Sequence, residues 1–232
     1  MRAKVFGDRV FYREEVDSTQ DWLRALIEDC PVEGLVCVAG VQSAGRGRRG
    51  RRWASPSGGL YLSFSLRWSG RPAVLGMFLA LAVHRWMRYL LEDVVIKWPN
   101  DLYSGSAKLG GILAEGPLEG LYLCGIGVNV QGRPEVEDKR VISLGDLGME
   151  VSRWEALFGI IDSVNECLAL EEEEIYQGYL EALWGLGRPW GILVGEREEV
   201  VLVKGVDRDG VLITDKGEFS SAEVLSIDGV KL

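Results

Sequence analysis

The order of apolar and polar positions along the chain predicts several regular elements. Over 60–66 the two kinds alternate with period two, which is typical of a half-buried strand. The segment 72–91 is apolar on nearly all sides and begins with Pro72, so it predicts a helix packed under a sheet. Strands are also expected over 94–97 and 121–130. In the latter, glycines recur at alternate positions, so one face carries no side chain there and can admit a flat ligand.

The N-terminal part predicts a strand near 10–12, a helix and a second strand over 34–39. The helix begins at Asp17 or Ser18, because both side chains accept hydrogen bonds from free N–H groups at a helix start. Capping alone would explain the Ser18-Thr19 pair.

The second half of the chain predicts helical structure over 153–186 with the acidic run 171–174 on a solvated face. Beyond it, short apolar segments separated by turns indicate a small β-barrel-like module. We therefore expect an α+β protein: a mixed β-sheet domain flanked by helices over 1–187, which carries the candidate site, followed by a β-barrel over 188–232.

Composition narrows the class of protein. The 232 residues include 26 Lys and Arg against 35 Asp and Glu, and a net charge of −9 argues against an extended nucleic-acid surface. Without an N-terminal signal pattern or a bilayer-length apolar run, we expect a cytoplasmic protein that does not enter a membrane. The single histidine, His84, is expected to be structural, which speaks against zinc sites and histidine triads.

The four cysteines follow no paired metal-binding spacing and are too sparse for a disulfide scaffold. We expect them to be buried apolar residues in a reducing compartment. They are Cys30, Cys37, Cys124 and Cys167.

One segment is strongly positive although the chain as a whole is negative: Gly45–Arg52 holds five arginines and three glycines. Glycines let a backbone approach a ligand closely, and guanidinium groups bind phosphates and carboxylates in bidentate pairs. The segment follows a predicted strand directly, so an anion-binding loop is one interpretation. A solvated basic turn and a nucleic-acid patch are the others.

Two further segments end strands with turn residues or glycines, and they bring in Asp101 and Lys108 beside Arg46 and Arg48 of the loop. Cations neutralise crowded phosphates, while a carboxylate can hold a magnesium ion or accept a proton. This combination suits a site for a nucleotide and a second anion.

The order and spacing of five motifs make the interpretation specific. They are Asp17-Ser-Thr19, Gly45-Arg-Gly-Arg-Arg-Gly-Arg-Arg-Trp53, Lys97-Trp-Pro-Asn-Asp101, Lys108-Leu-Gly-Gly-Ile112 and Gly125-Ile-Gly-Val-Asn129. Over residues 16–130 the chain closely resembles the biotin protein ligase family, also called biotin–[acetyl-CoA carboxylase] ligases, of the short monofunctional type. The resemblance implies a class II synthetase-like catalytic domain followed by an SH3-like barrel.

The resemblance also implies the reaction. The biotin carboxylate would attack the α-phosphate of ATP to give biotinyl-5′-AMP and pyrophosphate, with Mg²⁺ present, and a lysine of a biotin carboxyl carrier protein would then attack the mixed anhydride. The implied biotin-binding residues are Ser18, Thr19, Gln42, Arg46, Lys108, Gly111, Gly125 and Gly127. The implied ATP-binding residues are Arg48, Arg49, Trp53, Asn100, Lys108 and Asn129.

The implied catalytic residues are Lys108, Arg48 and Asp101. A cation is needed at Lys108 for a physical reason: two uncompensated anions at about 4 Å repel by several kcal/mol at intermediate dielectric. Asp101 could place magnesium or deprotonate the carrier lysine, and the sequence does not choose between these roles.

Two departures from the family pattern are visible. Gln20 stands where asparagine is common, which should leave the biotin contacts intact. The last predicted strand, 223–227, has no arginine of the kind that some relatives use near the nucleotide, so we expect no site residue in the tail.

The family also suggests a homodimer, and because no helix-turn-helix precedes residue 10 we expect no DNA binding. A lipoate ligase-like enzyme that modifies a carrier lysine is the nearest alternative. The alternative of another class is a nucleic-acid-binding module that uses the arginines and tryptophans as a stacking platform.

Overall fold

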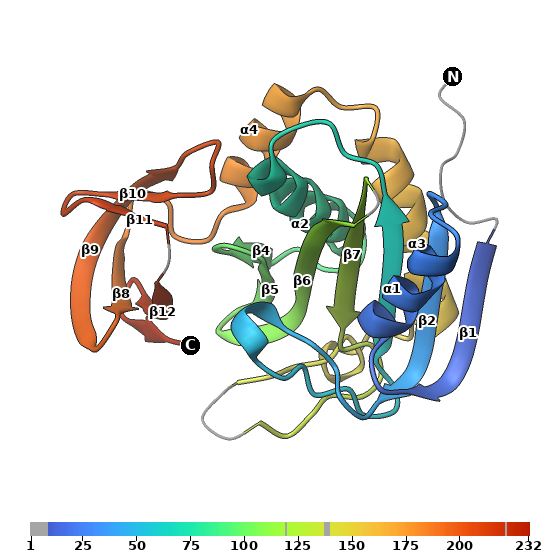
Figure 1. Cartoon of the computed structure of the whole chain (residues 1–232). Helices are drawn as coiled ribbons and strands as arrows, with labels where there is room; N and C mark the ends of the chain where they lie inside the picture. Colours follow the sequence, from blue (N-terminus) through green and yellow to red (C-terminus); the bar gives the residue numbers. More distant parts are fainter. Residues whose placement is uncertain (1–8, 119, 137–139, 221) are drawn as a thin grey trace.

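A computed structural model describes residues 9–118, 120–136, 140–220 and 222–232. Its main body is a seven-stranded sheet with helices on both faces (Figure 1). In spatial order the strands are β1 (Arg9–Val16), β2 (Leu35–Gln42), β3 (Leu60–Leu66), β7 (Leu121–Val128), β6 (Ala107–Leu118), β5 (Asp101–Ser104) and β4 (Val94–Lys97). Only β1 and β2 run parallel; every other neighbouring pair is antiparallel. The sheet is therefore mixed, as predicted.

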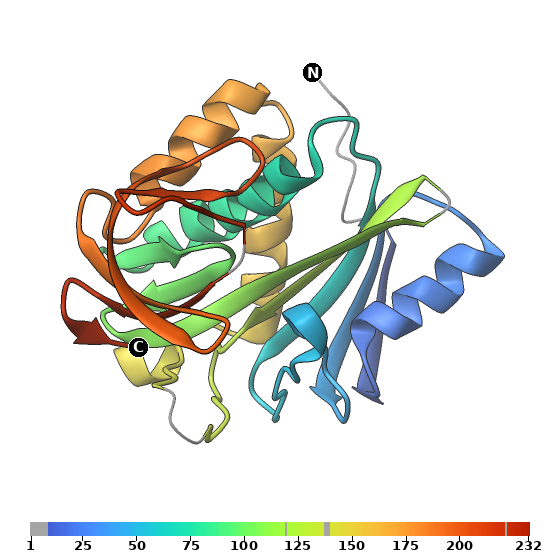
Figure 2. The same ribbon diagram turned by 60° about the vertical axis from the view of Figure 1, so that its left-hand side comes forward.

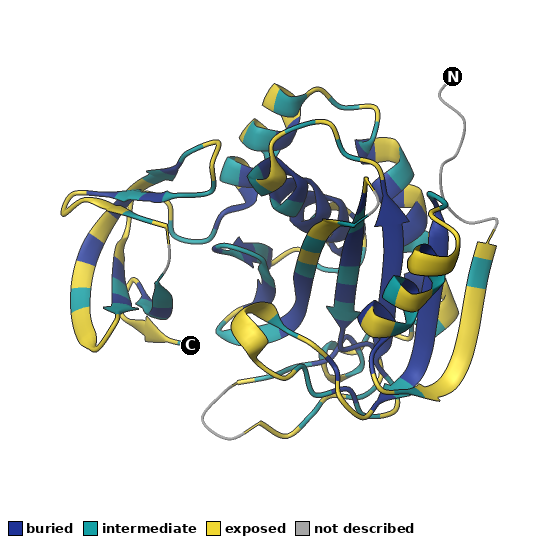
Figure 3. Cartoon of the chain, viewed as in Figure 1, coloured by how far each residue is buried: buried dark blue, intermediate teal, exposed yellow. Residues whose placement is uncertain are grey.

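Two apolar clusters lie on opposite faces of this sheet. Helix α1 (Thr19–Asp29) covers one face through Leu23 and Ile27, which pack with residues of β2 and β7. The other face is covered by α2 (Pro72–Arg88), and α3 (Arg153–Cys167) and α4 (Glu172–Ala182) pack against α2 in turn (Figure 2). Because both faces are covered, every residue of β3 is buried (Figure 3). The alternation in that strand had predicted burial on one face only.

The C-terminal module is a six-stranded antiparallel sheet, which confirms the predicted small β module. In spatial order its strands are β11 (Glu218–Phe219), β10 (Leu212–Thr214), β9 (Arg197–Val206), β8 (Pro189–Val194), β12 (Glu223–Ile227) and β13 (Val230–Lys231). Its contacts with the main body include hydrogen bonds from Trp98 Nε1 to the Gly210 carbonyl at 3.0 Å and from the Tyr176 hydroxyl to the Val206 carbonyl at 2.8 Å.

Several details differ from the sequence-based expectations. The helical region expected over 153–186 is two helices, and the acidic run 171–174 lies at the start of the second, exposed or partly exposed as expected. Glu171 caps α4 in a reciprocal capping box with Glu174. Carboxylates are favoured at this end because the helix dipole is positive there.

Two smaller points concern side chains expected to be structural. Cys30 is exposed, so the expectation that all four cysteines are buried was wrong for it. His84 Nε2 lies 3.0 Å from the Val94 carbonyl, and burial lowers the pKa of its ring, in keeping with a structural role.

Short 3₁₀ turns occur at Arg48–Gly50 and Gly145–Leu147. Among the described residues, no helix has both the length and the apolar character needed to cross a bilayer.

Phe78 offers a test of the core between the sheet and its helices. Its side chain is fully buried on α2, so Phe78→Ala should lower the free energy of unfolding by about 3–5 kcal/mol through lost transfer energy and a residual cavity. Tyr89, which follows α2 and is 82% exposed, provides the matched control. Tyr89→Ala should change stability by less than about 0.5 kcal/mol in urea unfolding. Similar losses for the two variants would contradict the assigned packing.

Candidate active site

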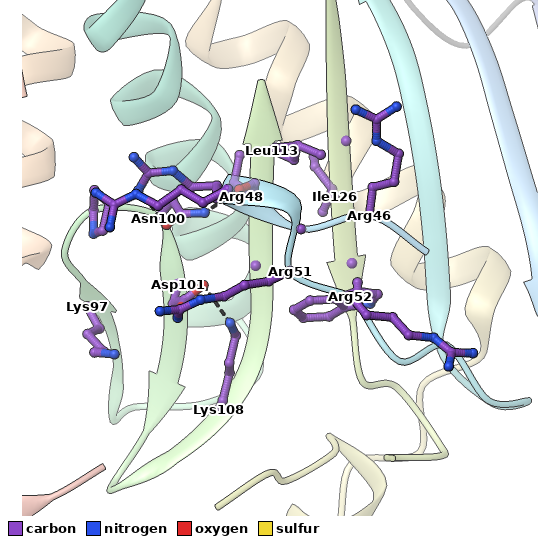
Figure 4. A pocket seen from close by; sticks show the side chains of 18 of the residues that line it. Arg46, Arg48, Arg51, Arg52, Lys97, Asn100, Asp101, Lys108, Leu113 and Ile126 are labelled. Carbon is purple, nitrogen blue, oxygen red and sulfur yellow. Dashed lines mark hydrogen bonds and ion pairs between the residues drawn. The ribbon is translucent and has the colours of Figure 1, made fainter. Parts of the chain in front are cut away.

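A cavity of about 480 Å³ opens where the arginine loop, the strands of the main sheet and the C-terminal module meet. Strands β3, β7, β6 and β5 contribute to its wall, and the loop between β2 and β3 crosses it (Figure 4). One end of the cavity is polar but uncharged, and the other carries cations. The two ends can therefore bind chemically different parts of one ligand.

The uncharged end is built at the start of α1. Ser18 caps the helix, as predicted, and its Oγ accepts hydrogen bonds from the backbone N–H groups of Gln20 and Asp21. The next residue, Thr19, donates through both its backbone N–H and its hydroxyl to Oε1 of Gln42, at 2.8 and 3.1 Å. The cap and these hydrogen bonds therefore fix the positions of Ser18 and Thr19, two of the predicted biotin-binding residues, at the wall of the cavity.

The arginine loop is tied down at several points. The Arg46 guanidinium bridges the carboxylates of Asp21 at 2.6 Å and Glu115 at 2.7 Å, and the hydrogen bond with Asp21 raises its pKa. Farther along, Arg51 binds both carboxylate oxygens of Glu223 on β12, and Arg52 donates to the Ser43 carbonyl. The loop is thus held from α1, from β6 and from the C-terminal module.

Arg48 reaches toward the cationic end. Its Nη1 donates to Asn100 Oδ1 at 3.2 Å, and burial, together with the charge of Arg49, lowers its pKa. Because the guanidinium has lost part of its hydration, an anionic ligand would stabilise its charge more strongly than it would in water.

Lys108 and Asp101 form the central charged pair of the cavity. Lys108 Nζ lies 2.7 Å from Asp101 Oδ1, and both side chains are only about a quarter exposed or less (Figure 4). The antiparallel pairing of β5 with β6 brings the two residues together across a register shift. The ammonium also lies 5.0 Å from the centre of the Trp53 ring. A partly buried cation is therefore held in place before any ligand arrives.

The three glycines expected at the site, Gly111, Gly125 and Gly127, form a glycine wall of the cavity, and Trp53 lies against two of them. A Cβ added at Gly127 would fall 2.5 Å from the Trp53 ring, and one at Gly111 would fall 2.9 Å from it. Side chains at either position would displace the indole. Trp53 Nε1 is buried with no hydrogen-bond partner in the described part of the chain, so it offers an unused donor.

With one exception, the residues expected at the site line this single cavity. Those that do are Ser18, Thr19, Gln42, Arg46, Arg48, Arg49, Trp53, Asn100, Asp101, Lys108, Gly111, Gly125 and Gly127. The exception is Asn129. Its side-chain N–H₂ donates to the backbone carbonyls of Lys108 and Ile142, so it supports the strand that carries Lys108.

Residues that sequence reasoning missed also line the cavity. Glu223 and its neighbours on β12 do so, although the tail was expected to contribute nothing. Gln20 and Ser63 lie at the uncharged end. The signal at Ser63 was a polar residue within a strand whose two faces are both covered, but the alternating pattern suggested that it faced solvent.

The chain is similar in sequence to proteins of known function. The sequence profile of the Biotin/lipoate A/B protein ligase family matches residues 12–130. The chain is 34% identical over 230 residues to the bifunctional ligase/repressor BirA of Escherichia coli, covering 90% of this chain and 70% of that protein. It is 31% identical over 196 residues to the biotin–[acetyl-CoA-carboxylase] ligase of Paracoccus denitrificans, covering 76% and 82%.

A solved structure shows the same architecture. The biotin protein ligase from Aquifex aeolicus in complex with biotin and ATP superposes with a TM-score of 0.79 at 29% identity, covering 94% of this chain and 98% of that one. The chain belongs to the biotin/lipoate A/B protein ligase family, and within it to the biotin protein ligases. It is therefore an enzyme of the biotin–[acetyl-CoA-carboxylase] ligase type.

The contact between Gly127 and Trp53 gives a test of how the loop is seated. Gly127→Ala should expel the indole, because the new methyl group would overlap it, and should expose Gly45–Arg52 to trypsin. Gly76 on α2 has open space around its Cα, so Gly76→Ala should leave the cleavage pattern unchanged. Cleavage sites are read by mass spectrometry of short digests. Equal cutting in both variants would show that Trp53 does not hold the loop.

Proposed function

We propose that the cavity activates biotin with ATP and transfers it to a lysine of a biotin carboxyl carrier protein. In the first step a carboxylate oxygen of biotin attacks the α-phosphorus, and the bond to the β-phosphate bridging oxygen breaks to release pyrophosphate. In the second, the lysine amine attacks the acyl carbon, AMP leaves and one proton is lost. The observation that carries the proposal is the joining of an uncharged buried end and a cationic end in one cavity.

The proposed division of roles follows that polarity. Ser18, Thr19 and Gln42 bind the ureido ring, and the glycine wall lies beside the fused rings. At the cationic end, Arg48 and Lys108 draw the biotin carboxylate and the α-phosphate together. Trp53 and Asn100 contact the nucleotide, with support from Arg49 and from Asn129 behind the strand.

Lys108 is the proposed main catalytic cation. Attack requires two anions within bonding distance, and a compact ammonium offsets their repulsion as charge builds on the phosphate. Its contacts with Asp101 and Trp53 keep it in position, which reduces the reorganisation needed when substrates bind.

Asp101 is proposed as the base that takes the proton of the carrier lysine in the second step. The same carboxylate could contribute to Mg²⁺ placement, since magnesium is usually bound by one or two carboxylates together with substrate phosphates. Among the described residues, no three His, Cys, Asp or Glu side chains cluster as a metal site, so bound magnesium would depend mainly on the ATP phosphates.

Other proposals concern the context of the enzyme. We place the domain boundary between residues 187 and 188, just before β8 (Pro189–Val194), the first strand of the C-terminal module. A cytoplasmic homodimer is proposed; the open edge strand β1, with Phe11 and Tyr12 exposed, is one surface available for self-association. Light scattering coupled to gel filtration tests the dimer.

The two alternative functions are less well supported. A lipoate ligase would place a dithiolane ring without N–H groups against a buried end formed by hydroxyls and amides. A nucleic-acid reader would need the loop arginines free, whereas Arg46 and Arg51 pair with carboxylates of the protein. No specific observation favours either one.

Lys108→Ala tests the first step. Loss of a preorganised electrostatic group typically costs about 10²–10³ in rate, so pyrophosphate release with biotin and ATP should fall by at least that factor. Lys204, exposed on β9, supplies the control, and Lys204→Ala should leave pyrophosphate release unchanged. Near-normal turnover of Lys108→Ala would remove Lys108 from its proposed role.

Asp101→Asn tests the second step. If Asp101 is the base, transfer to a carrier domain should fall by about 10²–10⁴, whereas biotinyl-AMP formation should fall much less, because the asparagine amide oxygen can still accept a hydrogen bond from Lys108. Asp93→Asn is the control, because Asp93 accepts a hydrogen bond from Ser104 outside the cavity. Single-turnover assays separate the two steps. A defect confined to adenylate formation and relieved by high Mg²⁺ would assign Asp101 to magnesium placement instead.

A further inference from the structure

Four buried polar side chains form a row at the uncharged end of the cavity. Gln42, Thr19, Ser63 and Gln20 are each at most 8% exposed. Three hydrogen-bond contacts join them in that order: Gln42 Oε1 to Thr19 Oγ1 at 3.1 Å, Thr19 Oγ1 to Ser63 Oγ at 2.8 Å, and Ser63 Oγ to Gln20 Oε1 at 2.8 Å. The row therefore has an amide at each end and two hydroxyls between them.

Both amides are fixed with their oxygens toward the hydroxyls. Gln42 Oε1 also accepts the backbone N–H of Thr19 at 2.8 Å, and its Nε2 donates to Ser55 Oγ. Gln20 Nε2 donates to the Leu123 carbonyl at 3.0 Å. Turning over either amide would place an N–H₂ group against a donor or a carbonyl against a carbonyl. The two ends of the row are thus acceptors only.

A count of protons then shows an imbalance. Thr19 and Ser63 supply one hydroxyl proton each, while the row contains three short contacts. One contact must bring two oxygens together without a proton between them. The row therefore has more acceptor positions than its two hydroxyl protons can fill, and a donor from a ligand can occupy one of them.

Ser18, next to this row, supplies a hydrogen-bond donor. Its Oγ accepts from two backbone N–H groups, and no acceptor for its own hydroxyl proton is present among the residues that the structure describes. A donor and a surplus of acceptors side by side complement a group that carries both a carbonyl and an N–H. A cyclic urea is such a group.

We propose that Ser63, oriented by Gln20, is a specificity-determining residue that accepts a ureido N–H of biotin at the closed end of the cavity. The ligand N–H fills an acceptor position of the row, so a ring with N–H groups gains a hydrogen bond there that a ring without them cannot make. This inference rests on the proposed function, since biotin is the carboxylic acid that brings the urea.

Ser65 provides a matched control for Ser63. Both are buried on β3, two positions apart and therefore on the same side of the strand. Ser65 Oγ donates to the Val32 carbonyl at 2.7 Å and accepts the Leu35 N–H at 3.1 Å, so its contacts are complete, and it does not line the cavity. Both variants remove a buried hydroxyl from the same strand, and only Ser63→Ala should affect ligand recognition.

The test measures dissociation constants by calorimetry for the full chain and its Ser63→Ala and Ser65→Ala variants. The ligands are biotin and two cyclic carbamate analogues, each with one ureido N–H replaced by oxygen. Wild type should bind one analogue about a hundredfold more weakly than biotin, because oxygen would face the acceptor surplus. Ser63→Ala should bind biotin about tenfold to a hundredfold more weakly and lose most of that discrimination, whereas Ser65→Ala should keep both.

Unchanged discrimination in Ser63→Ala, with biotin still bound by wild type, would overturn the inference and leave the proposed function standing. If wild type fails to bind biotin, the proposed function itself is wrong. Should Ser63→Ala not fold, Gln20→Met answers the same question. It removes the acceptor that takes the Ser63 proton, so two protons then serve two contacts. Biotin affinity should fall about tenfold, and wild-type affinity in Gln20→Met would contradict the proposal.

Discussion

The fixing of several cations around one cavity is the constraint on which the rest of the site depends. Like charges repel, so a ligand-free protein that gathers them must give them partners. Here Arg46 has Asp21 and Glu115, Arg51 has Glu223, and Lys108 has Asp101. These partners come from α1, β6, β12 and β5. The need to pair these cations therefore accounts for contacts that join helix α1, the main sheet and the C-terminal module around the cavity.

A sheet covered on both faces makes this precise placement possible. Burial on two sides fixes the register of β3, β7 and β6, and register decides which residues meet at the cavity. Gly111 and Gly127, on β6 and β7, leave room for the Trp53 ring, and this ring lies beside Lys108. Backbone shape, an aromatic ring and a cation are thus coupled, so a change in any one of them alters the position of the others.

The sequence allowed much of this to be predicted, for identifiable reasons. Trp53, Lys108 and Asp101 lie in motifs whose order is specific, and nearly all the residues expected at the site line one cavity. Three kinds of information were missing. Burial of Ser63 depends on strands paired across the sheet, Glu223 meets Arg51 across 172 positions, and the break before Glu171 depends on a capping box. Long-range pairing and local capping are both weakly encoded in apolar periodicity.

The two ends of the cavity solve opposite problems. At the cationic end, charges are matched inside the protein, so an incoming anion has to compete with Asp101 for Lys108. At the uncharged end, the row from Gln42 to Gln20 is short of one proton, so an incoming donor faces no competitor. In the proposed reaction, a ligand donor thus binds without competition at the uncharged end, while Lys108 stays paired with Asp101 until both anions are present. Recognition of the ring is therefore, in the proposed reaction, the condition for bringing the carboxylate to Lys108.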